Sequence, residues 1–342
     1  MITVFTEQHR LRNARTELHG GELVPPHECA ERAQYVLDRV REVSLGSVIE
    51  PSEFGIEPVL RVHEPQFVEF LSTAWADWVA AGNRGEAIPD CWPTRRMSPR
   101  RPTSITGRVG YYAMAGETSI SGGTWEAARA AANVALTGAA QLHRGARAAF
   151  ALCRPPGHHA AYDLYGGYCF LNNAAIAAQS LRDLGAARVA IVDVDFHHGN
   201  GTQDIFYSRN DVLFASIHGD PAEAFPHFLG YAEETGAGAG EGFNLNFPLP
   251  RGTAFPAWRE ALTVALARLR QFSPDAIVVS LGVDTFEHDP ISFFKLRSVD
   301  FSAYGTMLGA LGLPTLFVLE GGYAVTEVGV NVVNVLTGFE DA

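Results

Sequence analysis

The sequence predicts an α/β fold, in which a mostly parallel central sheet carries helices on both faces. Short β-branched runs are almost continuously apolar, as strands buried on both faces are. Longer helical patterns separate these runs, and such alternation is typical of a parallel sheet covered on both sides. The 342 residues are 47% hydrophobic and contain no linker-like stretch, so we expect a single domain over residues 1–342.

The expected elements follow one another along the second half of the chain. Strands are predicted at Ala148–Cys153, Val189–Val194, Val212–Ile217, Ala276–Leu281 and Thr315–Leu319. Helices are predicted at Trp125–His143, Asn172–Leu184, Ala254–Gln271 and Phe301–Leu311. Residues 83–123 differ in composition from the rest of the chain, with scattered proline, glycine and arginine. We interpret them as an insertion or long loop, and such loops in compact domains are usually functional or disordered.

Composition excludes several classes of protein. The polar stretch Met1–Arg10 has no apolar signal-peptide core, and no run of about 18 apolar residues predicts a membrane span. The four cysteines lack CxxC spacing, which favours a reducing cytoplasm. A net charge of −12 disfavours nucleic acid as the partner and favours small cationic substrates.

Polar clusters follow four of the predicted strands, at residues 154–159, 195–199, 282–284 and 320–323. The carboxyl ends of parallel strands meet at one edge of a sheet, where ligands bind. Any single cluster could consist of loop side chains that contact water. Four such clusters, with glycines that permit close backbone approach, predict one shared site.

Asp195 and His197 form the core of a predicted metal site. Residues two apart on an extended segment point to the same side, so this carboxylate and imidazole can bind one ion. Asp284 could supply a third ligand from another strand end. Three protein ligands leave a fourth position for water, the arrangement of a catalytic zinc site. A lone Asp-x-His motif is weak evidence for a metal site. It counts here because it follows a predicted strand and belongs to one of the four polar clusters.

His158 and His159 form a second candidate group. Beside a metal, one could act as general base and acid, and the other as its electrostatic partner. Asp193 and Asn200 could fix the ring tautomers through hydrogen bonds. Tyr323 follows two glycines and could donate to an oxyanion. The alternatives are core packing for either histidine and for the tyrosine.

Together these residues resemble the histone deacetylase superfamily, which has the arginase–deacetylase fold. The similarity lies in five blocks: Arg154–His159, Gly166–Asn173, Asp193–Gln203, Ser280–Asp284 and Glu320–Tyr323. Residues 5–9, Phe-Thr-Glu-Gln-His, and the insertion resemble one branch, the bacterial acetylpolyamine amidohydrolases. This second resemblance spans nearly the whole chain.

The resemblance implies one zinc ion per chain, with ferrous iron as the alternative, on Asp195, His197 and Asp284. It implies that His159 is the general base with His158 beside it, and that Tyr323 polarises the acetyl carbonyl. It implies a substrate tunnel walled by Tyr168 and Phe225, with Glu117 near its opening to attract the substrate's charge. It also implies a structural potassium ion on Asp193, Asp195, His197, Ser216 and Ile217.

Two departures from relatives refine this interpretation. Some deacetylases have aspartate where Asn200 stands. Asparagine lacks that charge, so the pKa of His159 could differ here. Arginase-like relatives hold two manganese ions through extra carboxylates, whose positions Gly199 and Gly282 occupy. A dinuclear centre is therefore not expected.

The expected function is hydrolysis of acetylated polyamines such as acetylputrescine, acetylcadaverine or acetylspermidine, which releases acetate and the free amine. The insertion at 83–123 is expected to form a homodimer that narrows the tunnel. A protein lysine deacetylase with the same chemistry is the alternative. A non-catalytic binding protein would be expected to lack Tyr323 or a metal ligand, and the sequence has them all.

Overall fold

Eight parallel strands form one central sheet in the computed structural model, which describes residues 1–342. Their spatial order is β4-β1-β5-β10-β9-β6-β7-β8, and every neighbouring pair is parallel. The strands are β1 (Ile2–Val4), β4 (Val48–Ile49), β5 (Ala148–Ala151), β6 (Val189–Asp193), β7 (Val212–Gly219), β8 (Asn244–Leu249), β9 (Ala276–Leu281) and β10 (Thr315–Leu319). A separate antiparallel hairpin consists of β2 (Glu17–His19) and β3 (Glu22–Val24).

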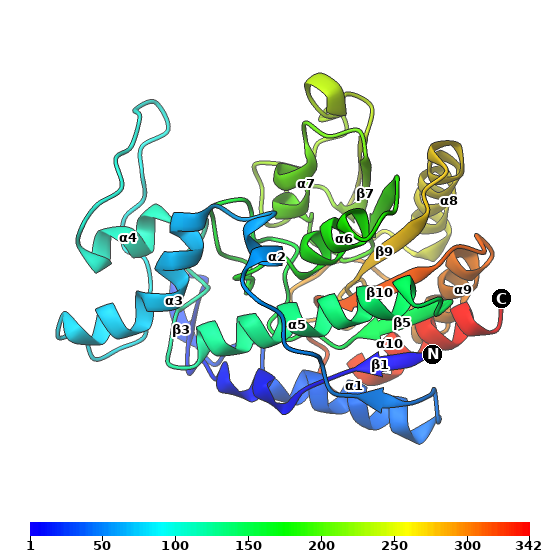
Figure 1. Ribbon diagram of the computed structural model, residues 1–342, viewed down its shortest axis with the longest axis horizontal. Coiled ribbons are helices and arrows are strands. Elements are labelled where there is room, and N and C mark those ends of the chain that lie inside the picture. Colours follow the sequence, from blue (N-terminus) through cyan, green and yellow to red (C-terminus); the bar gives the residue numbers. More distant parts are fainter.

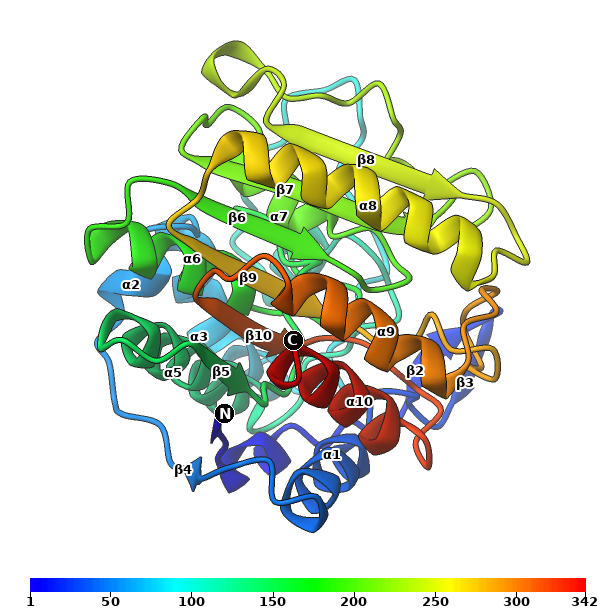
Figure 2. The same cartoon turned by 90° about the vertical axis from the view of Figure 1, so that its right-hand side faces the viewer.

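Helices cover both faces of the sheet (Figure 1; Figure 2). One face carries α2 (Glu57–Leu60), α3 (Pro65–Ala80), α5 (Thr124–His143), α6 (Asn173–Asp183) and α7 (Asn200–Phe206). The other face carries α1 (Ala30–Glu42), α8 (Phe255–Phe272), α9 (Ser298–Gly309) and α10 (Val328–Glu340). The short helix α4 (Ile105–Tyr111) lies with the segment that extends from the body at the upper left of Figure 1.

Alternate residues of the strands point into two separate hydrophobic cores. Ala149 and Ala151 of β5 belong to the core under α5 and α6. Ala148 and Phe150 of the same strand belong to the core under α9 and α10. Successive strand side chains point to opposite faces, so a strand covered on both sides must be apolar throughout. This requirement explains the continuous apolar runs of the sequence.

The predicted α/β fold is confirmed, and all five predicted strands and four predicted helices are present. β7 extends to Gly219, two residues beyond the prediction, and α9 begins at Ser298, three residues before it. The strands β1, β4 and β8 and the helices α1, α3 and α10 were not predicted from the sequence. β8 lies at the sheet edge and contains Pro248, which weakens its strand signal.

The insertion at 83–123 is partly structured rather than one long loop. It contains α4, and a bridge between Ala87 and Ile120 closes its base. Tyr112 is buried and stacks on Phe70, so it is unavailable for contacts with another chain. Trp92 and Met97 remain exposed.

No helix of the structure combines the length and the apolar character that a membrane crossing requires. The four cysteines form no disulfide. The cytoplasmic location stays a prediction.

Candidate metal centre at the carboxyl edge of the sheet

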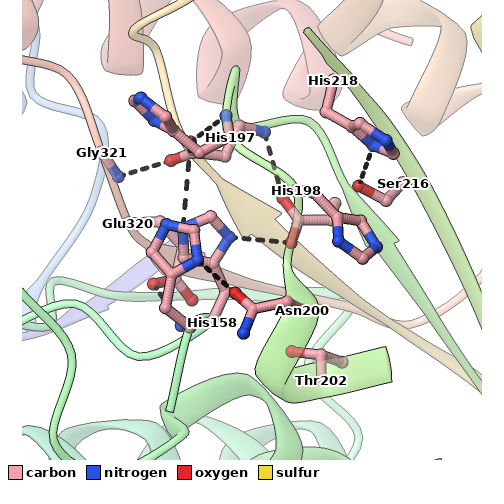
Figure 3. A network of polar contacts seen from close by, with 12 residues as sticks. His158, His197, His198, Asn200, Thr202, Ser216, His218, Glu320 and Gly321 are labelled. Atoms are coloured by element: carbon pink, nitrogen blue, oxygen red, sulfur yellow. Dashed lines mark hydrogen bonds and ion pairs between the residues drawn. The ribbon is translucent and has the colours of Figure 1, made fainter. Parts of the chain in front are cut away.

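The predicted site residues lie in the loops that leave the carboxyl ends of four strands. His158 and His159 follow β5, Asp195 and His197 follow β6, Asp284 follows β9, and Tyr323 follows β10. These four strands are adjacent in the order β5-β10-β9-β6. Adjacent parallel strands release their loops side by side, so residues up to 165 positions apart converge here. Figure 3 shows His158, His197 and Gly321 in this group.

Asp195, His197 and Asp284 form a compact buried group whose ligand atoms all lie within 4.8 Å of one another. His197 Nδ1 is 2.9 Å from Asp284 Oδ2 and 3.3 Å from Asp195 Oδ1. Asp284 Oδ1 accepts a 2.7 Å hydrogen bond from the backbone amide of Phe196. One imidazole and two carboxylates are a donor set suited to zinc or ferrous iron.

The surroundings of this group fit a single ion. Gly321 N donates to Asp195 Oδ2 over 2.8 Å (Figure 3). A Cβ atom at Gly321 would lie 2.6 Å from the carboxylate oxygens of both Asp195 and Asp284. A side chain at Gly282 would likewise collide with Asp195, and one at Gly199 with Asp193. Glycine at 199 and 282 therefore supplies no carboxylate for a second ion, and the Asp193 and Asp195 side chains fill the space beside these two glycines.

The pKa values of the two carboxylates, Asp195 and Asp284, are shifted in opposite directions. Burial raises the pKa of Asp284, and the nearby charge of Asp195 adds to the rise. Burial also opposes ionisation of Asp195, but the charge of His158 and the hydrogen bond from His197 outweigh it and keep its pKa below the usual value. Two buried carboxylates in contact with one imidazole call for a cation.

His158 pairs with Asp193 rather than facing open space. Its Nδ1 lies 2.9 Å from Asp193 Oδ2. Burial alone would lower its pKa, but the charges of Asp195 and Asp193 raise it to about 10. Asp193 is itself completely buried, and burial raises its pKa against the effect of His158.

His159 differs from its neighbour in its partner and in its charge state. Its Nδ1 donates to Oδ1 of Asn200 over 2.7 Å (Figure 3). Burial lowers the pKa of His159 well below the usual value, and the positive charge of His158 lowers it further. His159 is therefore neutral, with Nε2 free to accept a proton.

A cavity of about 470 Å³ opens over these residues. His159, His197 and Tyr323 line it, whereas His158, Asp195 and Asp284 lie behind its wall. Phe225 also lines the cavity, and its ring meets the His159 ring edge-on with 5.1 Å between centroids. The predicted wall residue Tyr168 lines it too, 5.5 Å from the Tyr323 ring.

Glu117 reaches the same cavity from the insertion. Its Oε1 accepts a 2.6 Å hydrogen bond from Gly167 N and one of 2.8 Å from the Thr118 hydroxyl. The next amide, that of Tyr168, donates to the Thr118 hydroxyl over 2.7 Å. Tyr168 has a φ of 65°, so these bonds stabilise a left-handed turn that a tyrosine rarely adopts.

The residues of the predicted potassium site lie together on β6, on β7 and just after β6. Asp193 is the register partner of Ser216, and both are completely buried. The Ser216 hydroxyl lies 2.8 Å from Nδ1 of His218 (Figure 3). Ile217 follows Ser216 on the strand, and Asp195 and His197 belong to the metal group as well.

Sequence reasoning missed the side chains that hold the Glu320–Tyr323 loop. Arg32 on α1 is buried and donates to the carbonyls of Glu320 and Gly322, each over 2.6 Å. Glu28 pairs with Arg32 and with Arg154. Removing one partner from such a buried ionic group costs about 3–5 kcal/mol. Glu28 precedes α1 and Arg32 lies on it, and two charged residues four positions apart gave no sign of this role.

Two more carboxylates were missed as contacts of the site. The Glu320 side chain accepts hydrogen bonds from the amides of Gly157 and His158, at 2.6 and 3.1 Å. Burial raises its pKa to about 7 despite the charge of His158. Asp289 accepts a 2.7 Å hydrogen bond from Tyr323 N and so fixes the backbone of that residue.

A parallel sheet with an Asp-His-Asp group, a histidine pair and a tyrosine at its carboxyl edge defines the arginase–deacetylase fold class. Residues 26–339 match the family described as "Histone deacetylase domain". The chain belongs to this histone deacetylase family.

The chain is also similar to individual members over its whole length. It is 60% identical to an acetylpolyamine amidohydrolase of Mycoplana ramosa, with 99% of each chain covered. It is 56% identical to acetylpolyamine amidohydrolase 2 of Pseudomonas aeruginosa, again over 99% of each. The crystal structure of an acetylpolyamine aminohydrolase from Burkholderia pseudomallei superimposes with a TM-score of 0.94 at 41% identity, covering 99% of this chain and 98% of that one.

Proposed function

We propose that the protein is a metal-dependent amidohydrolase that removes acetyl groups from acetylated polyamines. The observation that carries this proposal is the convergence in one cavity of a neutral His159, the Tyr323 phenol and the Glu117 carboxylate. The full-length similarity to acetylpolyamine amidohydrolases supports the substrate class.

Asp195, His197 and Asp284 would hold the ion, zinc or ferrous iron. When bound, the ion supplies a Lewis acid that polarises a carbonyl and lowers the pKa of a water molecule to about 7. The remaining steps belong to side chains of the protein. Asn200 orients His159, and the ring nitrogen of His159 that faces the cavity takes the proton from the attacking water.

His158 keeps its positive charge between Asp193 and Asp195, which keeps His159 neutral by repulsion. The Tyr323 hydroxyl donates to the developing oxyanion as the water adds to the acetyl carbonyl. His159 then returns its proton to the nitrogen of the leaving amine, so the carbon–nitrogen bond breaks to give acetic acid and the free amine. The acid proton then passes to the amine, which leaves acetate and an ammonium group. Burial raises the pKa of Tyr323 well above its usual value, so the phenol keeps its proton.

Glu117 provides the charge that a polyamine requires. Its Oε1 is used by Gly167 and Thr118, which leaves Oε2 for the distal ammonium group of the substrate. Tyr168 and Phe225 line the cavity beside His159 and pack against the intervening methylene chain. A protein lysine deacetylase would use the same chemistry. The Glu117 carboxylate, however, would bind the distal ammonium group of a polyamine, which the acetyl-lysine side chain of a peptide lacks.

We infer that the protein is a homodimer held through the insertion at 83–123. The exposed side chains Trp92 and Met97 support this inference, because tryptophan and methionine are enriched at interfaces. The adjacency of Asp193 and Ser216 supports a structural potassium ion on Asp193, Asp195, His197, Ser216 and Ile217.

A kinetic panel tests the substrate assignment. The zinc-loaded and iron-loaded proteins are each assayed with acetylputrescine, acetylcadaverine, acetylspermidine and an acetyl-lysine histone peptide, with acetate release as the readout. The small acetyl-diamines are expected to have the highest kcat/KM. A higher kcat/KM for the histone peptide would replace the proposal by protein lysine deacetylation.

A further inference from the structure

Another group of side chains whose types could hold a metal ion consists of Glu17 and His19 on β2 and His27 just after β3, and His19 lines the cavity. The ligand atoms of Glu17, His19 and His27 all lie within 4.8 Å of one another. We propose that these three residues bind a second divalent transition-metal ion of the zinc type, and that this ion inhibits the enzyme.

The local sequence brings the three side chains together. Glu17 and His19 are two apart on β2, so both point to one side of the strand, as in an Asp-x-His motif. Gly20 and Gly21 have φ values of 58° and 86° and form the tight turn that returns the chain along β3. After Pro25 and Pro26, the backbone amide of His27 donates to Glu17 Oε2 over 3.0 Å. This bond fixes His27 beside β2.

The group is largely organised before any ion binds. Glu17 is buried, and its Oε1 accepts a 3.3 Å hydrogen bond from the Tyr168 hydroxyl. His27 Nε2 lies 3.7 Å from the same oxygen, and the His19 and His27 rings are 5.6 Å apart. His19 is exposed, so a side-chain rotation can bring its nitrogen to the bond length of about 2.1 Å that zinc requires.

The donor set selects the class of ion. Two imidazoles and one carboxylate suit zinc and its late transition-metal neighbours, whereas calcium and magnesium prefer oxygen ligands alone. Three protein ligands leave a fourth position open to water. The burial of Glu17 on one side and the exposure of His19 on the other let an ion enter from solvent without crossing the cavity.

An ion at this position would weaken the binding of a cationic substrate. Leu18, His19 and Gly20 line the same cavity as Glu117 and His159. Leu18 and His19 are both exposed at its rim. Figure 2 shows the hairpin beside the loop that follows β9. A divalent cation there repels an ammonium group that approaches Glu117. Inhibition should therefore appear as a higher KM for cationic substrates. This inhibition rests on the proposed function, whereas the binding of the ion does not.

Metal binding is measured first, without substrate. Protein carrying its tightly held ion is titrated with zinc chloride by calorimetry and equilibrium dialysis. The wild type is expected to take up about one further ion at micromolar free zinc, and His19→Gln and His27→Gln should each weaken this uptake roughly 100-fold or more. His143→Gln, which changes an exposed histidine at the end of α5, is the matched control and should bind as the wild type does. Absence of a second ion, or equal binding by the His27 variant, would overturn the site.

Kinetics then test the inhibition. Zinc added to fill the second site should raise KM for acetylputrescine several-fold and leave kcat unchanged in the wild type and in His143→Gln. His27→Gln should keep its KM at the same zinc concentrations. A second ion that binds without changing KM would remove the inhibitory role. If no variant deacetylates any acetylpolyamine, the proposed function fails while the binding result still decides the metal site.

Discussion

Nδ1 of His159 lies 2.7 Å from Oδ1 of Asn200, so the histidine that faces the cavity is oriented by a neutral amide rather than by a carboxylate. His158, one residue earlier, has the carboxylate of Asp193 as its partner. The two imidazoles are 4.0 Å apart between centroids, yet they have opposite pKa shifts. The partner at Nδ1, together with the charges around each ring, separates their roles.

Asn200→Asp is expected to move the acid limb of the pH–rate profile to higher pH. A carboxylate at Nδ1 stabilises protonated His159, so its pKa rises, by roughly one to three units. His159 acts as a base only when deprotonated, so activity should then be lost at a higher pH than in the wild type. The profile of kcat/KM against pH measures this shift. An unchanged acid limb would mean that another group is the base.

Tyr323→Phe should lower kcat by roughly 100- to 1000-fold, the usual cost of removing one oxyanion donor. The ring stays in place because Arg32 lies over it at 4.8 Å and Asp289 holds its backbone amide. KM should therefore change little. Tyr162→Phe removes an exposed hydroxyl and serves as the control. Near-normal turnover by the Tyr323 variant would make this tyrosine a packing residue.

Asp284→Asn should remove the tightly held ion together with activity. The change keeps the shape of the side chain but takes away one of the two negative charges that face His197. Elemental analysis after dialysis is expected to find about one transition ion per wild-type chain and almost none in the variant, since three ligands with one open position make one site. Two dialysis-resistant manganese ions in the wild type would contradict the mononuclear centre.

Paired replacement of Trp92 and Met97 by glutamate should dissociate the proposed dimer. Both side chains are exposed on the insertion, and charge at the centre of an interface opposes its burial. Light scattering at micromolar concentration should report a dimer for the wild type and a monomer for the variant. Val264→Glu on α8 is the control. A monomeric, fully active wild type would refute the role of the insertion.

Glu117→Gln should raise KM for charged acetylpolyamines more than for an uncharged acetyl-amide of equal length. Glutamine keeps an oxygen that can accept from Gly167, so the turn at Tyr168 survives while the charge is lost. Glu117→Ala removes both and should lower kcat as well. Equal effects of Glu117→Gln on the two substrates would show that the carboxylate does not read charge.

Most of the sheet and the convergence of the metal group could be predicted from the sequence. Buried parallel strands must be apolar throughout, and the polar residues after them must meet at one edge. This placed Asp195, His197 and Asp284 together without any knowledge of distances. The roles of these residues, and of the histidine pair, remain predictions that the variants above test.

The supporting contacts could not be predicted, because they join positions far apart that carry no motif. Tyr168 and Glu17 are 151 residues apart, and Arg32 and Glu320 are 288 apart. A buried arginine on a helix looks in sequence like any charged residue of a solvent-exposed face. Short strands such as β1 and β4, of three and two residues, offer too few positions for a periodic pattern.

The position of β10 between β5 and β9 has a consequence for biosynthesis. β10 is the last strand along the sequence, yet it occupies the middle of the sheet. Until a ribosome has delivered it, the growing chain presents two unpaired, strongly apolar strand edges, the kind of surface that attracts other chains. A nascent chain that stalls before residue 315 therefore lacks the strand that joins the two halves of its sheet.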